Sequence, residues 1–239
     1  MIFTIVHYNT PELITCCVAS VLKNYPDAKI IIFENSDKRK FENLFGDSVE
    51  VIDNSSGRFL DFNLEITNLI KSNGLDESEV KRTEAAVSNF ASFKHSISVQ
   101  YLFDHINEDF ILLDSDVLLK KRLDVELDGS VAICDYNQNR IFPFIVKFNN
   151  NLIKKHNILF CDRKHILPVK GIPSYDTGGY FLTQVKENNL SLRKINFEDY
   201  VVHYGNGSWK ENGNKRSSLK TYKMDKFEWM NKFKNLWWN

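Results

Sequence analysis

The chain has 239 residues, of which 43% are hydrophobic and 26% are charged, a balance typical of a soluble globular protein with a hydrophobic core. Its 31 basic and 31 acidic side chains give a formal net charge of zero, so no overall positive field indicates a nucleic-acid-binding protein. Because no Cys/His cluster has zinc spacing and no apolar stretch reaches the roughly 20 residues that cross a bilayer, we expect a cytoplasmic protein with reduced thiols.

The first half of the chain alternates short apolar runs with helical patterns, as parallel sheets do. Three of these runs are predicted to be buried strands: residues 2–7, 28–33 and 49–52. A long helix, predicted over residues 84–106, leads into a further apolar run. This order predicts an α/β fold with a doubly wound, mostly parallel sheet.

The apolar run at residues 110–119, with the sequence FILLDSDVLL, contains two carboxylates one residue apart. An ionised carboxylate buried in such a run costs several kcal/mol unless another group pairs with it. We therefore expect a central strand over residues 110–113, with Asp114 and Asp116 at its carboxyl edge, where open α/β sheets bind ligands. Two carboxylates there suit Mg²⁺ or Mn²⁺, which usually binds a substrate phosphate as well. The spacing alone favours a simpler interpretation, a solvated turn in which each aspartate caps a backbone N–H.

Polar residues follow the first two predicted strands, Tyr8 and Thr10 after the first and Glu34 after the second. In a parallel sheet both loops lie at the same edge as Asp114. Glu34 can accept a hydrogen bond from the N–H of a uracil-type base, while Tyr8 or Thr10 can stack on the base or bond to it. Helix and turn capping explains each of these residues, taken singly, about as well.

Two segments of the second half carry further candidates. His203 opens the sequence HYGNGSWK, and a neutral imidazole is a suitable third metal ligand beside two carboxylates. The glycines after it allow backbone to approach a diphosphate, whose charge Lys210 or Arg216 can neutralise. Asp176, in the sequence YDTGG, lies at a predicted helix start, where it can take a proton from a substrate hydroxyl or simply act as an N-cap.

The remaining pattern of the second half predicts shorter elements. Further strands are expected over residues 130–134, 141–148, 192–197 and 200–204, with a turn at 149–151 and a helix from the YDTGG segment to residue 188. Residues 205–218 are rich in Gly, Asn, Ser, Lys and Arg and are predicted to form a loop. No internal repeat or low-complexity linker interrupts the chain, so one continuous domain is expected.

In their order and spacing, these segments resemble the GT-A glycosyltransferases, most closely small bacterial and viral enzymes related to glycosyltransferase family 2. The resemblance spans roughly residues 2–210, and its strongest pieces are FILLDSDVLL and VVHYGNGSWK. It implies that a Mn²⁺ or Mg²⁺ ion is held by three residues: Asp114, Asp116 and His203. It implies that the nucleotide-sugar donor is contacted by Tyr8, Thr10, Glu34, His95, Asp114, Ser115 and Lys210. Asp176 is the implied catalytic base.

The resemblance also implies an activity and an organisation. The activity is metal-dependent transfer of a hexose from a UDP- or dTDP-linked donor to a hydroxyl of a glycan or lipid-linked saccharide, with inversion, as in polysaccharide biosynthesis. The alternatives are a retaining transferase and a non-catalytic nucleotide- or glycan-binding module. The implied fold is a single GT-A domain over residues 1–218, with a nucleotide-binding half (1–120) and an acceptor half that includes a smaller antiparallel portion (121–218).

Residues 219–239 are aromatic and basic and are predicted to form a separate C-terminal helix. At helical spacing, one face carries Phe227, Met230, Phe233 and Trp237, flanked by Trp229 and Trp238. A basic amphipathic helix can bind a membrane surface peripherally, near a lipid-linked acceptor. The simpler interpretation, in which the aromatic side chains pack on the core, is favoured by the frequency of such helices in globular proteins.

Overall fold

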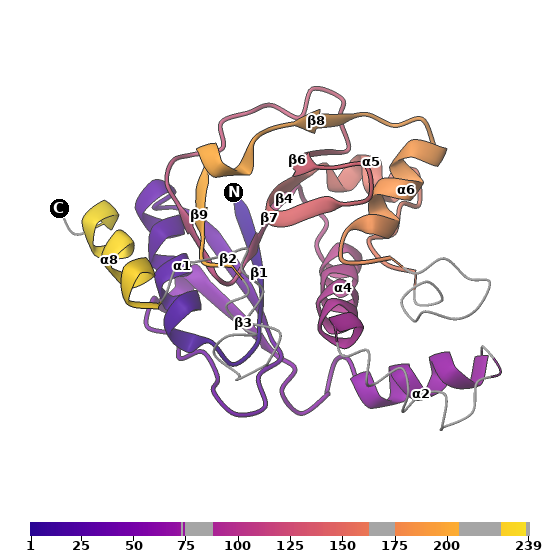
Figure 1. Cartoon of the computed structure of the whole chain (residues 1–239), viewed down its shortest axis with the longest axis horizontal. Coiled ribbons are helices and arrows are strands. Elements are labelled where there is room, and N and C mark those ends of the chain that lie inside the picture. Colours follow the sequence, from indigo (N-terminus) through magenta and orange to yellow (C-terminus); the bar gives the residue numbers. More distant parts are fainter. Residues whose placement is uncertain (73, 75–87, 163–174, 206–225, 238–239) are drawn as a thin grey trace.

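A seven-stranded sheet with the order β3-β2-β1-β4-β7-β6-β8 forms the centre of the fold (Figure 1). The computed structural model describes residues 1–72, 74, 88–162, 175–205 and 226–237. The strands are β1 (Ile2–His7), β2 (Lys29–Glu34), β3 (Val49–Asp53), β4 (Phe110–Asp114), β6 (Ala132–Tyr136), β7 (Ile141–Phe148) and β8 (Leu192–Lys194). Six of them run in one direction and only β7 is antiparallel to its neighbours. The predicted α/β class with a mostly parallel, Rossmann-like sheet is confirmed.

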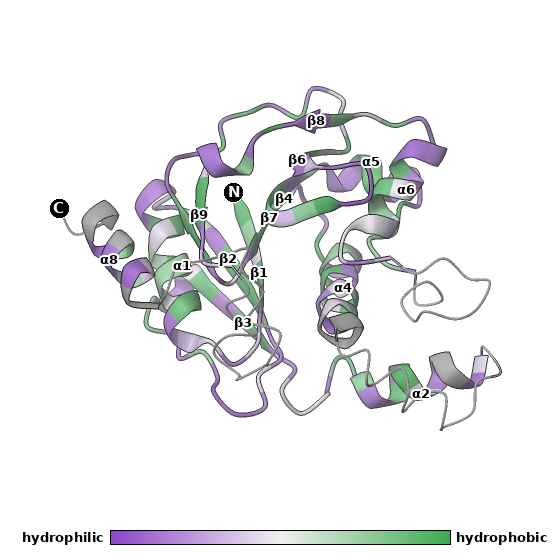
Figure 2. Cartoon of the chain, in the orientation of Figure 1, coloured by the Kyte–Doolittle hydropathy of each residue, from purple (hydrophilic) through white to green (hydrophobic). Residues whose placement is uncertain are grey.

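The central strands are continuous apolar runs because both faces of the sheet are covered. In β4, Phe110 and Leu112 belong to the hydrophobic cluster on the side of α4, and Ile111 and Leu113 belong to the cluster beneath α1. All four side chains are fully buried, which contributes roughly 1.5–3 kcal/mol each. Figure 2 shows the hydrophobic residues gathered along the strands and on the covered sides of the helices.

Helices cover the two faces of the sheet unequally. The described helices are α1 (Pro11–Asn24), α2 (Phe62–Ser72), α4 (Ser88–His105), α5 (Asn150–Lys155), α6 (Gly179–Glu187) and α8 (Lys226–Trp237), with 3₁₀ turns at Gly46–Ser48 and Phe197–Asp199. Figure 1 shows α1 against one face, α4 and α6 on the other side, and α2 apart from the sheet. The positions of β1, β2, β3 and β4 agree with the predicted ranges to within about two residues, as sequence patterns allow.

The apolar run at residues 110–119 is divided between two sheets, which the sequence did not predict. After β4 the chain turns at Ser115 and continues as β5 (Val117–Leu119), which leaves the main sheet and pairs antiparallel with β9 (Val201–His203). Val117 is paired with His203 in this small sheet. The pairing places the late histidine beside the aspartates that end β4.

Three other boundaries differ from the predicted ones. The turn expected at 149–151 is the start of α5, because the Asn149 side chain caps this helix by accepting a hydrogen bond from the Leu152 N–H (3.0 Å). The strand expected over 192–197 ends at Lys194, and the helix expected to start at the YDTGG segment begins at Gly179. Apart from Gly205, the predicted loop at 205–218 lies outside the described residues.

The C-terminal helix α8 packs Trp229 and Phe233 against α1, as the simpler interpretation predicted. Trp229 is fully buried and Phe233 is 9% exposed, in a cluster with Leu13 and Cys16 of α1 and with Tyr204. The predicted face was wrong in one respect, because Trp229, expected to flank it, lies at its centre. None of the described helices combines the length and the hydropathy that a membrane span requires.

Candidate functional site

The parallel strands β1, β2, β3 and β4 end beside one another, at the same edge of the sheet. His7, the last residue of β1, is paired with Glu34, the last residue of β2, and Glu34 is paired with Asp53 of β3. On the other side of β1, Val6 is paired with Asp114. The predicted loops after β1 and β2 and the aspartates after β4 therefore meet at the same edge.

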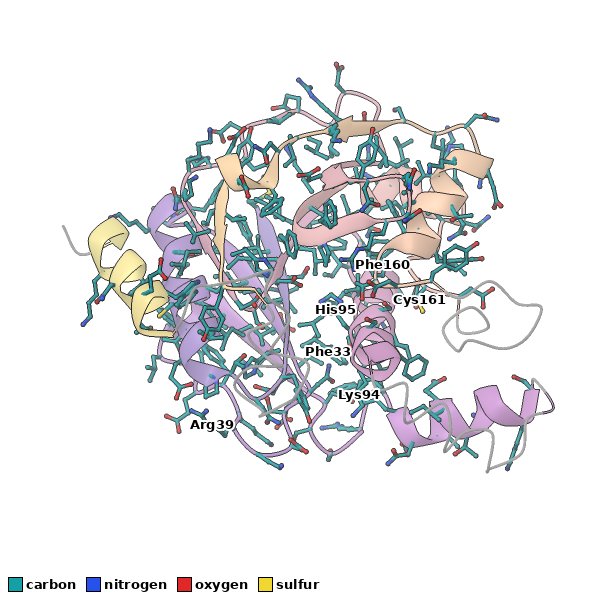
Figure 3. All side chains as sticks on the ribbon, in the orientation of Figure 1. Phe33, Arg39, Lys94, His95, Phe160 and Cys161 are labelled. Carbon is teal, nitrogen blue, oxygen red and sulfur yellow. The ribbon has the colours of Figure 1, made fainter. Side chains whose placement is uncertain are left out.

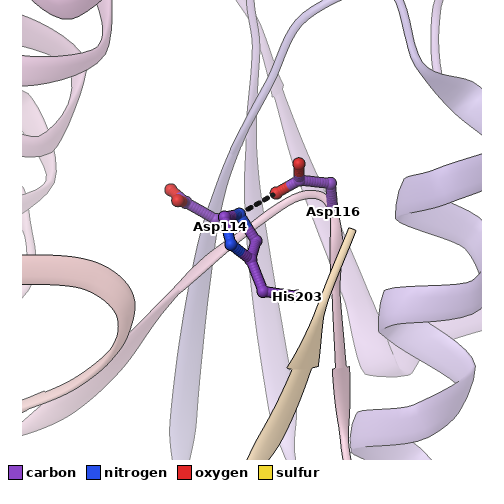
Figure 4. A group of neighbouring side chains, drawn as sticks. All are labelled: Asp114, Asp116 and His203. Carbon is purple, nitrogen blue, oxygen red and sulfur yellow. Dashed lines mark ion pairs between the residues drawn. The ribbon is translucent and has the colours of Figure 1, made fainter. Parts of the chain in front are cut away.

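Three potential metal ligands converge there (Figure 4). One ligand atom each of Asp114, Asp116 and His203 lies within 4.8 Å of the others, and His203 Nε2 lies 3.3 Å from Asp116 Oδ1. The side chains of His203 and Asp116 are 8% and 10% exposed, and that of Asp114 is 20% exposed. The Tyr204 N–H donates to the Asp116 carbonyl (2.9 Å) and fixes the backbone of the two segments against each other.

The geometry of this group fits a small divalent cation. In an octahedral site with bonds of about 2.1 Å, neighbouring ligand atoms lie about 3 Å apart, close to the observed separation of His203 and Asp116. Two carboxylate oxygens and an imidazole nitrogen form a donor set that suits Mn²⁺ or Mg²⁺. A cation would also offset the cost of keeping two carboxylates together in a largely buried position.

Helix α4 contributes His95, whose Nε2 lies 3.3 Å from Asp114 Oδ1. Figure 3 shows His95 and its neighbour Lys94 on the side of α4 that faces the strands. One turn earlier on α4, the Ser92 hydroxyl donates to Asp176 Oδ1 (2.8 Å). Since residues three apart lie about 4.5 Å apart along a helix axis, α4 connects Asp176 to the candidate metal ligands over a short distance.

Asp176 is held by charged and polar partners. Its Oδ2 pairs with the guanidinium of Arg140, and its Oδ1 also accepts a hydrogen bond from the Thr177 N–H (2.8 Å). The carboxylate is half exposed, so it lies at the surface of the site. To act as the predicted base, Asp176 has to leave the guanidinium, because an ion-paired carboxylate is a poor proton acceptor.

The backbone after Asp176 turns at Gly178, against the first residue of β7. Gly178 adopts a φ of +78°, and a Cβ there would lie 2.6 Å from Ile141 Cγ1 and 2.8 Å from the Ile141 carbonyl oxygen. Both the left-handed backbone and the contact with β7 therefore require glycine at this position.

We predict that Gly178→Ala lowers the free energy of unfolding by about 2–3 kcal/mol, since it combines backbone strain with overpacking. Urea unfolding measures the effect, and Gly74→Ala is the matched control, because Gly74 also has a positive φ (+65°) but nothing within 4 Å of an added Cβ. Equal losses in the two variants would show that the contact with Ile141 is unimportant.

A buried network joins the loops after β1 and β2. His7 Nε2 accepts from the Thr10 N–H (2.9 Å), and His7 Nδ1 donates to Glu34 Oε2 (2.7 Å). Glu34 also accepts from the N–H groups of Ser36 and Phe41, both at 2.8 Å. Burial raises the pKa of Glu34, but its hydrogen bonds, that from His7 foremost, outweigh burial and hold the pKa below its usual value.

This network involves two residues that were predicted to contact the donor. Glu34 is 1% exposed, and its carboxylate accepts hydrogen bonds from His7 and from two N–H groups of its own loop, so it organises the loop. Thr10 is fully buried and precedes α1, but its side chain makes no capping hydrogen bond. For both residues, contact with the donor stays a prediction.

Tyr8 is half-buried beyond the end of β1 and is one of the predicted donor contacts that the structure leaves partly accessible. The Lys94 ammonium lies 5.9 Å from the centroid of the Tyr8 ring and 5.4 Å from that of Phe62. Burial and the nearby Asp37 raise the pKa of Tyr8, so its hydroxyl remains protonated at neutral pH. The two rings and the cation offer a flat, positively charged contact for a nucleotide at the sheet edge.

Some residues of the site could not be found from motifs. Arg140 belongs to no recognisable pattern and reaches Asp176 only because β7 brings it to the same edge. Lys94 is one of many lysines, and only the rings around it distinguish it. Ser115 lies in the turn between the two aspartates, whereas Lys210 lies outside the described residues.

Comparison with solved structures finds glycosyltransferases. An active-site mutant of LgtC is 14% identical, with a TM-score of 0.48 over 82% of this chain and 73% of that chain. Apo GlyE from Streptococcus pneumoniae TIGR4 is 11% identical (TM-score 0.46; 92% and 52%). The mannosyltransferase PcManGT from Pyrobaculum calidifontis, in complex with GDP-Man and Mn²⁺, is 8% identical (TM-score 0.46; 81% and 54%). No protein-family model and no curated protein matches the chain. These likenesses are too distant to assign an activity.

Proposed function

We propose that this protein is a metal-dependent glycosyltransferase that moves a sugar from a nucleoside-diphosphate sugar, UDP- or dTDP-linked, to a saccharide hydroxyl. The observation that carries the proposal is the convergence of Asp114, Asp116 and His203 at the carboxyl edge of a mostly parallel sheet. Open α/β sheets bind their ligands at this edge, and a carboxylate pair with an imidazole is a donor set for the ions that accompany diphosphates.

On the donor side, Asp114, Asp116 and His203 would hold Mn²⁺ or Mg²⁺. Such an ion, when bound, supplies Lewis-acid stabilisation of the negative charge on a departing nucleoside diphosphate. His95 Nε2 lies 3.3 Å from the Asp114 carboxylate, on the side of α4. We propose that Tyr8 and Lys94 contact the nucleotide, which their proximity supports, and that Ser115 and Lys210 are further donor contacts.

On the acceptor side, we propose Asp176 as the group that takes the proton from the acceptor hydroxyl. An inverting reaction in one step needs a base opposite the leaving group, and in this structure Asp176 is neutralised by Arg140. We therefore propose sugar transfer with inversion, for which Asp176 has to separate from Arg140, and retention is the alternative. The anomeric configuration of the product, read by ¹H NMR, decides between inversion and retention.

We expect a nucleotide sugar to raise the melting temperature of the protein only when Mn²⁺ is present. A ligand at 100 times its Kd stabilises the folded state by about 2.7 kcal/mol, which shifts Tm by several degrees. The test is a panel of UDP-, dTDP- and GDP-linked sugars, each with Mn²⁺ and with EDTA, followed by an assay of slow donor hydrolysis. The proposal fails if no nucleotide sugar stabilises the protein in either condition.

A further inference from the structure

An aromatic surface lies next to the candidate metal site and has no role in the function proposed above. It consists of Phe142 and Phe144 of β7 and Phe197 of the 3₁₀ turn, all partly exposed. The rings of Phe142 and Phe144 are parallel within 1°, with centroids 5.7 Å apart, and Phe197 is tilted against both, at 6.5 and 4.7 Å. We call these three rings the aromatic wall.

The aromatic wall begins at the metal site. The Phe144 ring lies 4.0 Å, centroid to centroid, from the imidazole of His203. In the sheet, Ile145 is paired with Leu113, so the residue before it, Phe144, lies level with Asp114. Phe142 lies two residues earlier in β7, beyond the end of the antiparallel strand β4. Phe142 therefore extends outward from the candidate metal ligands.

Polar groups border the outer end of the aromatic wall. The guanidinium carbon of Arg140 lies 5.4 Å from the centroid of the Phe142 ring, and the same guanidinium pairs with Asp176. The guanidinium lies over the Phe142 ring and, with its partner carboxylate, provides hydrogen-bond donors and acceptors next to the apolar rings.

Sheet order separates the aromatic wall from the nucleotide contact. Tyr8 follows β1 and Phe142 lies on β7, and β4 with its aspartates runs between these two strands. A ligand that binds on the aromatic wall therefore approaches the candidate metal site from the side opposite the nucleotide. This is the side from which an acceptor has to approach a donor sugar held at the metal.

We propose that the aromatic wall is the acceptor subsite and that it takes a neutral pyranose ring, an inference that rests on the proposed function. One face of a pyranose presents C–H groups, which suit the negative face of an aromatic ring, and its rim presents hydroxyls. Stacking on Phe142 places those hydroxyls within the range of Arg140 and Asp176. Binding of an acceptor hydroxyl to this pair is also a means of loosening the carboxylate from the guanidinium.

The test compares Phe142→Leu with Phe142→Tyr and with the matched control Phe59→Leu. Phe59 is another accessible phenylalanine, 40% exposed, and it contacts Arg58 and Tyr101 away from the site. Binding of a panel of methyl glycosides and disaccharides is followed by saturation-transfer NMR. Donor binding is measured separately as the Mn²⁺-dependent Tm shift, with the nucleotide sugar that the donor panel described above identifies.

We expect Phe142→Leu to weaken saccharide binding about tenfold, a typical value for one lost ring contact, while Phe142→Tyr and Phe59→Leu retain it. The donor Kd should stay within about twofold of wild type, since the nucleotide lies across β4. The subsite is refuted if Phe142→Leu binds saccharides as wild type does, or if wild type binds no member of the panel at about 50 mM, where even very weak affinities register. If no nucleotide sugar raises the Tm of the wild type in the presence of Mn²⁺, that result would instead refute the proposed function.

Discussion

We expect Asp116→Ala to abolish the Mn²⁺-dependent Tm shift by a nucleotide sugar and to lower sugar transfer by roughly 10³-fold, the size of loss expected when a main source of charge stabilisation is removed. Asp116 is the more buried carboxylate of the pair and lies 3.3 Å from His203. Without it, a cation would keep one carboxylate and one imidazole of the three ligands that the described residues offer. Isothermal titration with Mn²⁺ and transfer from a labelled donor measure the two effects.

The same substitution should leave the metal-free protein close to wild type in stability, within about 1 kcal/mol. The Asp116 carbonyl continues to accept from the Tyr204 N–H, because that bond involves only backbone, and removing a largely buried carboxylate relieves its repulsion with Asp114. Asp124→Ala is the control, since Asp124 is 68% exposed and pairs only with Arg122 among the described residues. If the alanine variant at 116 responds to Mn²⁺ and donor as wild type does, the metal assignment is wrong.

Local patterns were enough to predict the strands that build the sheet edge. Residues 2–7 and 110–114 are apolar runs buried on both faces, and Pro11 at the first position of α1 marks a helix start that requires no tertiary information. Because parallel strands end at a common edge, the meeting of these loops with Asp114 also followed from the sequence.

Pairings between distant segments could not be predicted in the same way. The strand at 117–119 continues an apolar run and gives no local sign that it leaves the main sheet to pair with residues 201–203. His203 was proposed as a ligand from its type and its glycine-rich surroundings, and the small sheet is what brings it to Asp116. Arg140 and the phenylalanines of the aromatic wall have no motif, since their roles depend on where β7 begins relative to the end of β4.

Glu34 shows why residue type alone misleads at such an edge. A carboxylate after a buried strand has the same sequence signature whether it turns outward to a ligand or inward to its own loop. The outcome depends on His7, 27 residues earlier, and on the amides of Ser36 and Phe41, which together supply enough hydrogen bonds to bury the charge. The sequence therefore predicted a polar loop, and the fold decided which of its residues face outward.

His7→Leu is expected to lower the free energy of unfolding by about 3–5 kcal/mol, because it leaves the buried carboxylate of Glu34 without its closest donor. It also removes the acceptor of the Thr10 N–H at the start of α1. Chemical denaturation at neutral pH measures the loss. His105→Leu is the matched control, since His105 is exposed on α4 and its ring stacks on Tyr101; a surface change of this kind costs about 0.5 kcal/mol.

The double variant His7→Leu with Glu34→Gln separates the buried charge from the lost packing. Removing the charge should recover at least 1 kcal/mol of the loss, since two residues in direct contact are energetically coupled. The pH dependence gives a second measure. Because the folded-state pKa of Glu34 lies below its unfolded value, its contribution is fully present above the unfolded pKa and is lost as pH falls through the folded pKa. Wild type should therefore lose stability in acid more steeply than Glu34→Gln. Additive losses together with parallel acid curves would mean that the His7–Glu34 pair contributes nothing specific, and that the loops at the sheet edge are held by their backbone bonds alone.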